Sequence, residues 1–198
     1  THTFPDKLNY EIIALGASTG GPSALEAIIT SLPENINVPV VIAQHMPSRF
    51  LETFAVRLNE HSLLPVRLAK RGEMLSEGNI YIAPGEGNMR IELNALHGKP
   101  AVTFTDKTFQ EFNNPSIDCL FESIARTYGE KSMGVILTGM GKDGTIGLSA
   151  IKKSGGLTLA QDECSSVVFG MPKSAVDANA VDQVLPLKDI PAFIISHL

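Results

Sequence analysis

Three residue types that serine-based acyl transfer requires each follow a short apolar segment of this sequence. Ser18 lies in a Gly-Ala-Ser-Thr-Gly-Gly turn, His45 in a Gln-His-Met-Pro segment, and Asp143 in a Gly-Met-Gly-Lys-Asp-Gly segment. A serine hydroxyl becomes an effective nucleophile when an imidazole takes its proton, and a carboxylate on the other ring nitrogen fixes the imidazole tautomer. The oxyanion that develops also needs backbone N–H donors already in place. Together the three segments favour a serine hydrolase.

The turn that carries Ser18 matches the G-x-S-x-G nucleophile elbow, which connects a strand to a helix. The order of the residues here is serine, histidine, aspartate, whereas α/β-hydrolases have the order serine, acid, histidine, so the match does not assign the chain to that superfamily. A single match of this kind is more often a structural turn than an active site. The glycines of the 16–21 turn could also bind a phosphate group at the start of the following helix.

The other two residues have non-catalytic alternatives as well. A single histidine in a loop is more often a structural residue than a catalyst, and Asp143 could be the N-cap of a helix over 144–151. A dinucleotide site is disfavoured, because Ser18 replaces the middle glycine of G-x-G-x-x-G. The second apolar segment also ends in glutamine and His45 and lacks the acidic residue that binds a ribose. A phosphate- or nucleotide-binding α/β domain stays open as an alternative.

The pattern of apolar residues predicts the elements that would position these side chains. Four continuously apolar segments are typical of parallel strands covered on both faces, and they span residues 12–15, 40–43, 133–138 and 157–160. Three amphipathic helices lie between them, with apolar faces at Leu25/Ile28/Ile29/Leu32, Leu51/Phe54/Ala55/Leu58 and Ile117/Leu120/Phe121/Ile124. Pro22 suits the first turn of the first helix, and we expect Ser48 and Ser116 to be the N-caps of the other two.

These elements predict a doubly wound α/β fold, with a mostly parallel sheet and helices on both faces in a Rossmann-like three-layer α/β/α arrangement. Residues 79–83 and 89–93 are expected to form an antiparallel hairpin around a Gly-rich loop, and a further turn precedes a strand at 101–104. We expect residues 1–10 to be a linker or tail and residues 11–198 to be one catalytic domain. Ser18, His45 and Asp143 would then meet beyond the carboxyl ends of the parallel strands.

Composition narrows the range of functions. The formal net charge of −5 disfavours nucleic-acid binding, which requires clustered lysine and arginine. No apolar run is long enough to cross a bilayer, and the first residues show no signal-peptide pattern, so we expect no membrane insertion. Cys119 and Cys164 have neither metal-ligand spacing nor the pattern of a disulfide framework, which fits the reducing cytoplasm.

The amino-acid sequence around the three residues is more specific than their spacing. It resembles the sequence of the catalytic domain of the CheB-type chemotaxis protein-glutamate methylesterases. The similarity covers nearly all of residues 12–184. It is carried by the segments 13–22, 44–47 with Phe50 and 54–58, 81–85, 115–118, 137–144, 160–163 and 168–172.

The resemblance implies a role for each matching residue. Ser18 would be the nucleophile, His45 the general base and Asp143 the residue that orients it, while Thr19 and Met140 would contribute backbone N–H groups to the oxyanion. The substrate would be a glutamate methyl ester on the cytoplasmic helices of a chemoreceptor, and methanol would be released. Members of the family often also deamidate receptor glutamines. The resemblance implies neither an organic cofactor nor a metal.

Two features depart from the family pattern. The family usually places a phosphorylatable receiver domain before this one, where this sequence has only the 1–10 segment, so the chain is expected to be a fragment or to act without that domain. Many members also carry a histidine near Asn88, in a Gly-x-His context that here reads Gly87-Asn88-Met89. A non-catalytic receptor-binding adaptor that kept the fold is a further alternative, which the presence of all three candidate residues disfavours.

Overall fold

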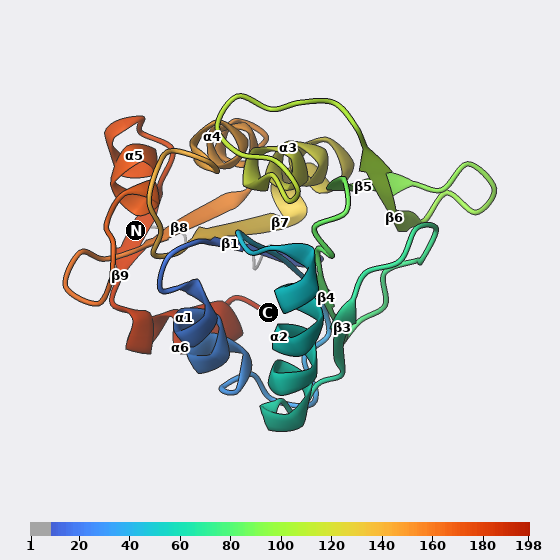
Figure 1. Ribbon diagram of the computed structural model, residues 1–198, viewed down its shortest axis with the longest axis horizontal. Coiled ribbons are helices and arrows are strands. Elements are labelled where there is room, and N and C mark those ends of the chain that lie inside the picture. The colour runs from blue at the N-terminus through green and yellow to red at the C-terminus, as the bar shows by residue number, and fades with distance from the viewer. Residues whose placement is uncertain (1–8) are drawn as a thin grey trace, which may run out of the picture.

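A seven-stranded sheet forms the centre of the molecule in the computed structural model, which describes residues 9–198 (Figure 1). The strands lie in the order β3-β4-β2-β1-β7-β8-β9, and every neighbouring pair is parallel. A separate antiparallel pair, β5-β6, lies beside it. The bounds are β1 Ile12–Ala17, β2 Val40–Gln44, β3 Val66–Leu68, β4 Ile80–Ile82, β5 Asn88–Leu93, β6 Pro100–Thr105, β7 Ser132–Ile136, β8 Leu157–Gln161 and β9 Gln183–Leu185.

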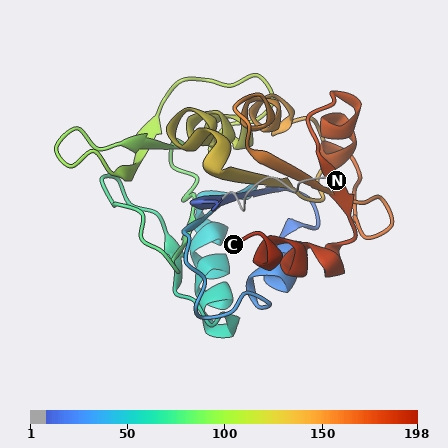
Figure 2. The same ribbon diagram turned by 180° about the vertical axis from the view of Figure 1, so that it is seen from behind.

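Helices cover both faces of the seven-stranded sheet, as Figures 1 and 2 show from opposite sides. One layer contains α1 (Gly21–Ile29), α2 (Ser48–His61) and α6 (Ile190–Ser196), and the other contains α3 (Ile117–Tyr128), α4 (Thr145–Lys153) and α5 (Met171–Asp177). Two short 3₁₀ turns span Gly129–Lys131 and Leu187–Asp189. The doubly wound, three-layer α/β/α fold predicted from the sequence is confirmed.

The two layers enclose two separate apolar cores, because successive side chains of a strand point to opposite faces of a sheet. In β1, Ile13 and Leu15 pack with α1 and α2, whereas Ile12 and Ala14 pack with α3 and α4. All six residues of β1 are buried, as are all five of β2 and of β7. Burial on both faces is the reason for the continuously apolar sequence of these strands.

The predicted hairpin was partly wrong. Residues 80–82 form β4 and pair in parallel with β2 and β3, so they belong to the main sheet. The hairpin consists instead of β5 and β6, joined by the turn expected near residue 98. It packs on α3, where Ser123 Oγ accepts from the Ile91 N–H at 2.9 Å and Thr127 Oγ1 donates to the Ile91 carbonyl at 2.8 Å. The residue pattern of a strand does not tell which other strand it pairs with, because pairing is a contact between residues that are distant in the chain.

Several short elements were not predicted, namely β3, β9, α5 and α6, which have only three to seven residues each. Segments of this length show too few periods for an amphipathic pattern. Ser116 is confirmed as the N-cap of α3, since its Oγ accepts from the Cys119 N–H at 3.0 Å. The N-cap of α2 is Pro47, one residue before the expected Ser48. Most of the tail expected at 1–10 lies outside the described residues.

The start of α3 and the start of α4 are joined through two buried aspartates. Asp143 Oδ1 accepts from the Asp118 N–H at 2.9 Å, and Asp118 Oδ1 accepts from the N–H groups of Gly144 and Gly147 at 3.0 and 2.8 Å. Each carboxylate thus satisfies backbone donors that a helix start leaves free. One alternative from the sequence was that Asp143 is the N-cap of the helix that follows it. The structure contradicts this, because the Asp143 carboxylate binds the start of α3 instead.

The pKa of the Asp118 carboxyl is raised from its ordinary 3.8 to about 7, chiefly by burial and also by the nearby Asp143, while the N–H groups of Gly147 and Gly144 oppose the shift. A carboxyl with a raised folded-state pKa binds a proton that the unfolded chain has already released. Its contribution to stability is therefore present below the unfolded pKa and is lost as the pH rises from about 4 to about 7. The free energy of unfolding should accordingly fall across this window, by an amount on the order of a few kcal/mol.

The variant Asp118→Asn removes this titration, so its free energy of unfolding should change less between pH 5 and pH 8 than that of the wild type. Urea unfolding at a series of pH values measures the difference. The variant Asp177→Asn, which changes an exposed carboxylate on α5, is the control and should keep the wild-type slope. Equal slopes for Asp118→Asn and the wild type would contradict the expectation.

Candidate active site

The three candidate residues meet at one edge of the central sheet, as the sequence predicted. Ser18 directly follows β1, His45 directly follows β2, and Asp143 lies in the loop between β7 and α4. The strands β2, β1 and β7 are neighbours in the sheet. Because all three run in parallel, their carboxyl ends lie at the same edge. Residues 98 positions apart in the chain are thereby in direct contact.

His45 and Asp143 form a buried pair. His45 Nε2 lies 2.6 Å from Asp143 Oδ2, and the side chains are only 5% and 2% exposed. The same carboxylate accepts from the N–H groups of Ile117 at 2.8 Å and Asp118 at 2.9 Å. Both N–H groups belong to the first turn of α3, where unpaired N–H groups and the helix dipole favour a negative charge. The arrangement can hold the imidazole in one orientation, with Nε2 toward the carboxylate.

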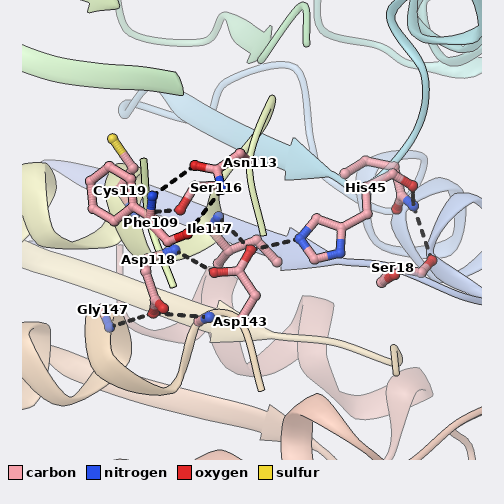
Figure 3. Close-up of polar contacts among 12 residues, drawn as sticks. Ser18, His45, Phe109, Asn113, Ser116, Ile117, Asp118, Cys119, Asp143 and Gly147 are labelled. Atoms are coloured by element: carbon pink, nitrogen blue, oxygen red, sulfur yellow. Dashed lines mark hydrogen bonds and ion pairs between the residues drawn. The ribbon is translucent and has the colours of Figure 1, made fainter. Parts of the chain in front are cut away.

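Ser18 lies on the other side of the imidazole from Asp143 (Figure 3). Ser18 and His45 line one cavity of about 340 Å³, together with Met46, Pro47 and residues 112–114. Among residues 9–198, no hydrogen bond joins the Ser18 hydroxyl to His45. Catalytic hydrogen bonds are often long in ligand-free enzymes and shorten only when substrate is bound.

Gln44, the last residue of β2, connects the backbones of the candidate nucleophile and base. Its side chain is 1% exposed, and its Nε2 donates to the Ser18 carbonyl and to the His45 carbonyl, both at 3.0 Å. A Cβ atom at residue 21 would collide with Gln44 Oε1, so only glycine fits at the start of α1. In the sequence, Gln44 stood out only as a single polar residue at the end of an apolar strand. Sequence analysis had assigned it no function.

The backbone beside Ser18 offers N–H groups to a developing negative charge. The Ser18 N–H itself donates to the Thr138 carbonyl at 3.0 Å, whereas the N–H groups of Thr19 and Met140 donate to no other backbone group within residues 9–198. A Cβ at Gly139 would lie 2.7 Å from Ser18 Cβ, so the absence of a side chain there lets the Met140 loop approach the serine. Thr138 Oγ1 donates to the Thr19 carbonyl at 2.9 Å and holds the two loops together.

Phe112 covers the imidazole of His45, and sequence analysis had assigned it no role. The two ring centroids are 3.7 Å apart and the ring planes differ by 14°. The phenyl ring is 41% exposed, so it forms part of the surface of the site. Phe112 belongs to neither a helix nor a strand, and no periodic pattern marks it.

The described residues contain no site for a metal or a membrane span. No group of three or more His, Cys, Asp or Glu side chains in this part of the chain is arranged to hold a metal ion. Within residues 9–198, none of the helices has the length and apolar character needed to cross a bilayer.

Comparisons with known proteins identify the family to which the chain is similar. The family model described as CheB methylesterase matches residues 13–194. Relatives from Pyrococcus abyssi and Moorella thermoacetica, both named protein-glutamate methylesterase/protein-glutamine glutaminase, are 41% and 46% identical over 92% and 94% of this chain. The chain spans 49% and 44% of the lengths of these two relatives, or about half.

A solved structure extends the similarity to three dimensions. The crystal structure of the Thermotoga maritima CheB methylesterase catalytic domain is similar to this chain with a TM-score of 0.89 and 40% sequence identity. The similarity covers 96% of this chain and 99% of that domain. The match of the family model, the identity of the relatives and the shared fold lead to one conclusion: the chain belongs to the CheB methylesterase family.

Proposed function

We propose that this chain is the catalytic part of a protein-glutamate methylesterase and that Ser18, His45 and Asp143 carry out the reaction. The observation that carries the proposal is the buried His45–Asp143 pair beside Ser18, in a cavity at the carboxyl edge of the sheet. Membership of the CheB methylesterase family and the names of the relatives support the same activity.

The reaction is a two-step acyl transfer. Ser18 Oγ attacks the ester carbonyl carbon while the other ring nitrogen of His45, Nδ1, takes the hydroxyl proton. Asp143 on Nε2 stabilises the imidazolium that forms. When the tetrahedral intermediate collapses, the C–O bond to the methoxy group breaks and His45 returns the proton, so methanol leaves. Water then attacks the acyl group with His45 as base, which releases the glutamate side chain and restores the Ser18 hydroxyl.

The N–H groups of Thr19 and Met140 stabilise the oxyanion of both intermediates. Both amides lack a backbone acceptor among the described residues, and the close approach at Gly139 brings the Met140 loop to Ser18. Donors that are already oriented need no reorganisation in the transition state. Gln44 contributes indirectly, because it holds the carbonyl groups of Ser18 and His45.

The substrate is a glutamate methyl ester on the cytoplasmic helices of a chemoreceptor, so the reaction takes place in the cytoplasm. A glutamine side chain presents an amide carbonyl in the same position, with ammonia in place of methanol as the leaving group, and receptor deamidation belongs to this proposal. The relatives' names include both activities. The resemblance to the family also implies a receiver domain as the regulatory partner, and this partner belongs to the proposal.

The site does not favour the phosphate-binding alternative. A phosphate at the start of α1 requires several N–H groups that point outward. Here the Ser18 N–H donates to Thr138 and the Gly21 N–H to the Ser18 carbonyl, at 3.0 and 2.8 Å. A non-catalytic adaptor would not need the His45–Asp143 pair, whose burial costs free energy unless it is fully hydrogen-bonded.

Replacement of Ser18 by alanine should reduce methanol release from methylated receptors to the uncatalysed background, because no other hydroxyl is available for acylation at that position. The fold should persist, since the Ser18 side chain forms no hydrogen bond within residues 9–198. Methanol release and circular dichroism measure the two effects. The exposed Ser31→Ala is the control and should keep full activity. Wild-type turnover by Ser18→Ala would disprove the nucleophile assignment.

The variant Asp143→Asn should lower kcat by about a hundredfold or more, since the negative charge that stabilises the imidazolium is lost. Asp118→Asn is the matched comparison. Its carboxyl is also buried at the α3–α4 junction, but the hydrogen bonds recorded for it go to backbone N–H groups, so we expect a loss of less than about tenfold. Equal losses for the two variants would mean that Asp143 acts only through the stability of the junction.

A further inference from the structure

One face of the His45 imidazole is covered by a side chain that comes from an irregular segment. Phe112 lies in residues 106–114, between β6 and α3, and stacks on His45 at a centroid distance of 3.7 Å. Residues 106–114 form neither helix nor strand. None of them takes part in a hydrogen bond between two backbone groups among those recorded for the described residues. The position of Phe112 therefore depends on side chains that hold this segment.

Asn88 provides most of that support. It is the first residue of β5 and is only 2% exposed, and it pairs with Thr105 at the end of β6. Its Nδ2 donates to the Lys107 carbonyl at 3.0 Å and to Asn113 Oδ1 at 2.9 Å. Its Oδ1 accepts from the Asn114 N–H at 2.7 Å. One buried amide thus binds both ends of the segment, two residues after β6 and directly after Phe112.

Asn113 completes the support from within the segment. Its Oδ1 accepts from the Phe109 N–H at 2.8 Å and its Nδ2 donates to the Phe109 carbonyl at 2.9 Å, as Figure 3 shows in part. The amide of Asn113 therefore closes a small ring around residues 109–113. Asn88 holds this ring, and Phe112 immediately precedes Asn113 in the chain.

The covering ring affects the chemistry of the imidazole in two ways. A phenyl face at van der Waals distance prevents the imidazole from rotating out of the line between Asp143 and Ser18. An aromatic face also attracts a cation, so it favours the imidazolium that forms when His45 takes the serine proton. Asn88 does not line the cavity that contains Ser18, so it can influence the reaction only through the groups that it positions.

We propose that Asn88 is a positioning residue for the reaction: it fixes residues 106–114 so that Phe112 stacks on His45 and keeps the imidazole between Asp143 and Ser18. The effect on turnover rests on the proposed methylesterase function, whereas the effect on the geometry of His45 does not. This assigns a role to the residue at which the chain departs from the family pattern.

A double-mutant cycle on methanol release tests the proposal. Phe112→Ala and Asn88→Ala should each lower kcat by about tenfold or more, because a small displacement of a catalytic group is costly. Phe112→Tyr, which keeps the aromatic face, should keep most of the activity. If Asn88 acts through Phe112, adding Asn88→Ala to Phe112→Ala should change kcat by less than about twofold. The same factor in both backgrounds would overturn the proposal, as would full activity of Phe112→Ala.

Matched controls come from the same hairpin and from the other layer of the fold. Asn94 Oδ1 accepts from the N–H groups of Leu96 and His97 at the far end of the hairpin, and Phe193 of α6 stacks on His197, the residue after that helix, at a centroid distance of 4.3 Å. Asn94→Ala and Phe193→Ala should keep the wild-type kcat. Asn88→Asp keeps the acceptor for Asn114 but cannot donate to Lys107 or Asn113, so it should also lower kcat and serves as the second variant if Asn88→Ala does not fold.

Nuclear magnetic resonance of the His45 ring protons separates this proposal from the proposed function. The stacked phenyl ring shifts these protons, and the shift should be lost in Phe112→Ala and strongly reduced in Asn88→Ala, but unchanged in Asn94→Ala. If the wild type releases no methanol, the proposed function fails while the ring-proton shifts still decide the role of Asn88. Unchanged His45 shifts in a folded Asn88→Ala would overturn the positioning role.

Discussion

The buried carboxylate of Asp143 is the group on which the rest of the site depends. A charge that is 2% exposed is tolerated only where hydrogen bonds replace water, and here the start of α3 and His45 supply them. This requires the first turn of α3 to lie against the loop that follows β7. Asp118 extends the same principle to the start of α4. The acid is thus part of the helix junction, and its position is as rigid as the packing of the two helices.

On the other side of the site, hydrogen bonds from side chains to backbone carbonyl groups hold the loops in place. Gln44 holds the carbonyl groups of Ser18 and His45, which both line the cavity, and Thr138 connects the turn after β1 with the loop after β7. Both side chains are buried. Polar groups in such positions are stable only when they are paired, so their partners are narrowly determined. The edge of the sheet is therefore organised before any substrate is present, which is the condition for electrostatic stabilisation of a transition state.

The exposed side of the site is organised differently. Residues 106–114 have no regular structure. The side-chain amides of Asn88 and Asn113 make the hydrogen bonds that neighbouring backbone groups would make in a strand. Asparagine suits this task because one side chain both donates and accepts. A strand over residues 89–93 was predicted from the sequence, but the partner of the first side chain of β5, Asn88, was not. That partner lies 19 to 26 residues away, in a segment without periodicity.

We could predict from the sequence the layered α/β class, the main strands and the placement of Ser18, His45 and Asp143 at one sheet edge, because burial on two faces and helical spacing leave periodic patterns. The sequence motifs also indicated the family that the comparisons establish. Four features became known only from the folded chain: β4 joins the main sheet, Asp143 binds the start of α3, Gln44 connects Ser18 with His45, and Phe112 covers the imidazole. Each of these is a contact between residues far apart in the chain, which local propensity and periodicity do not encode.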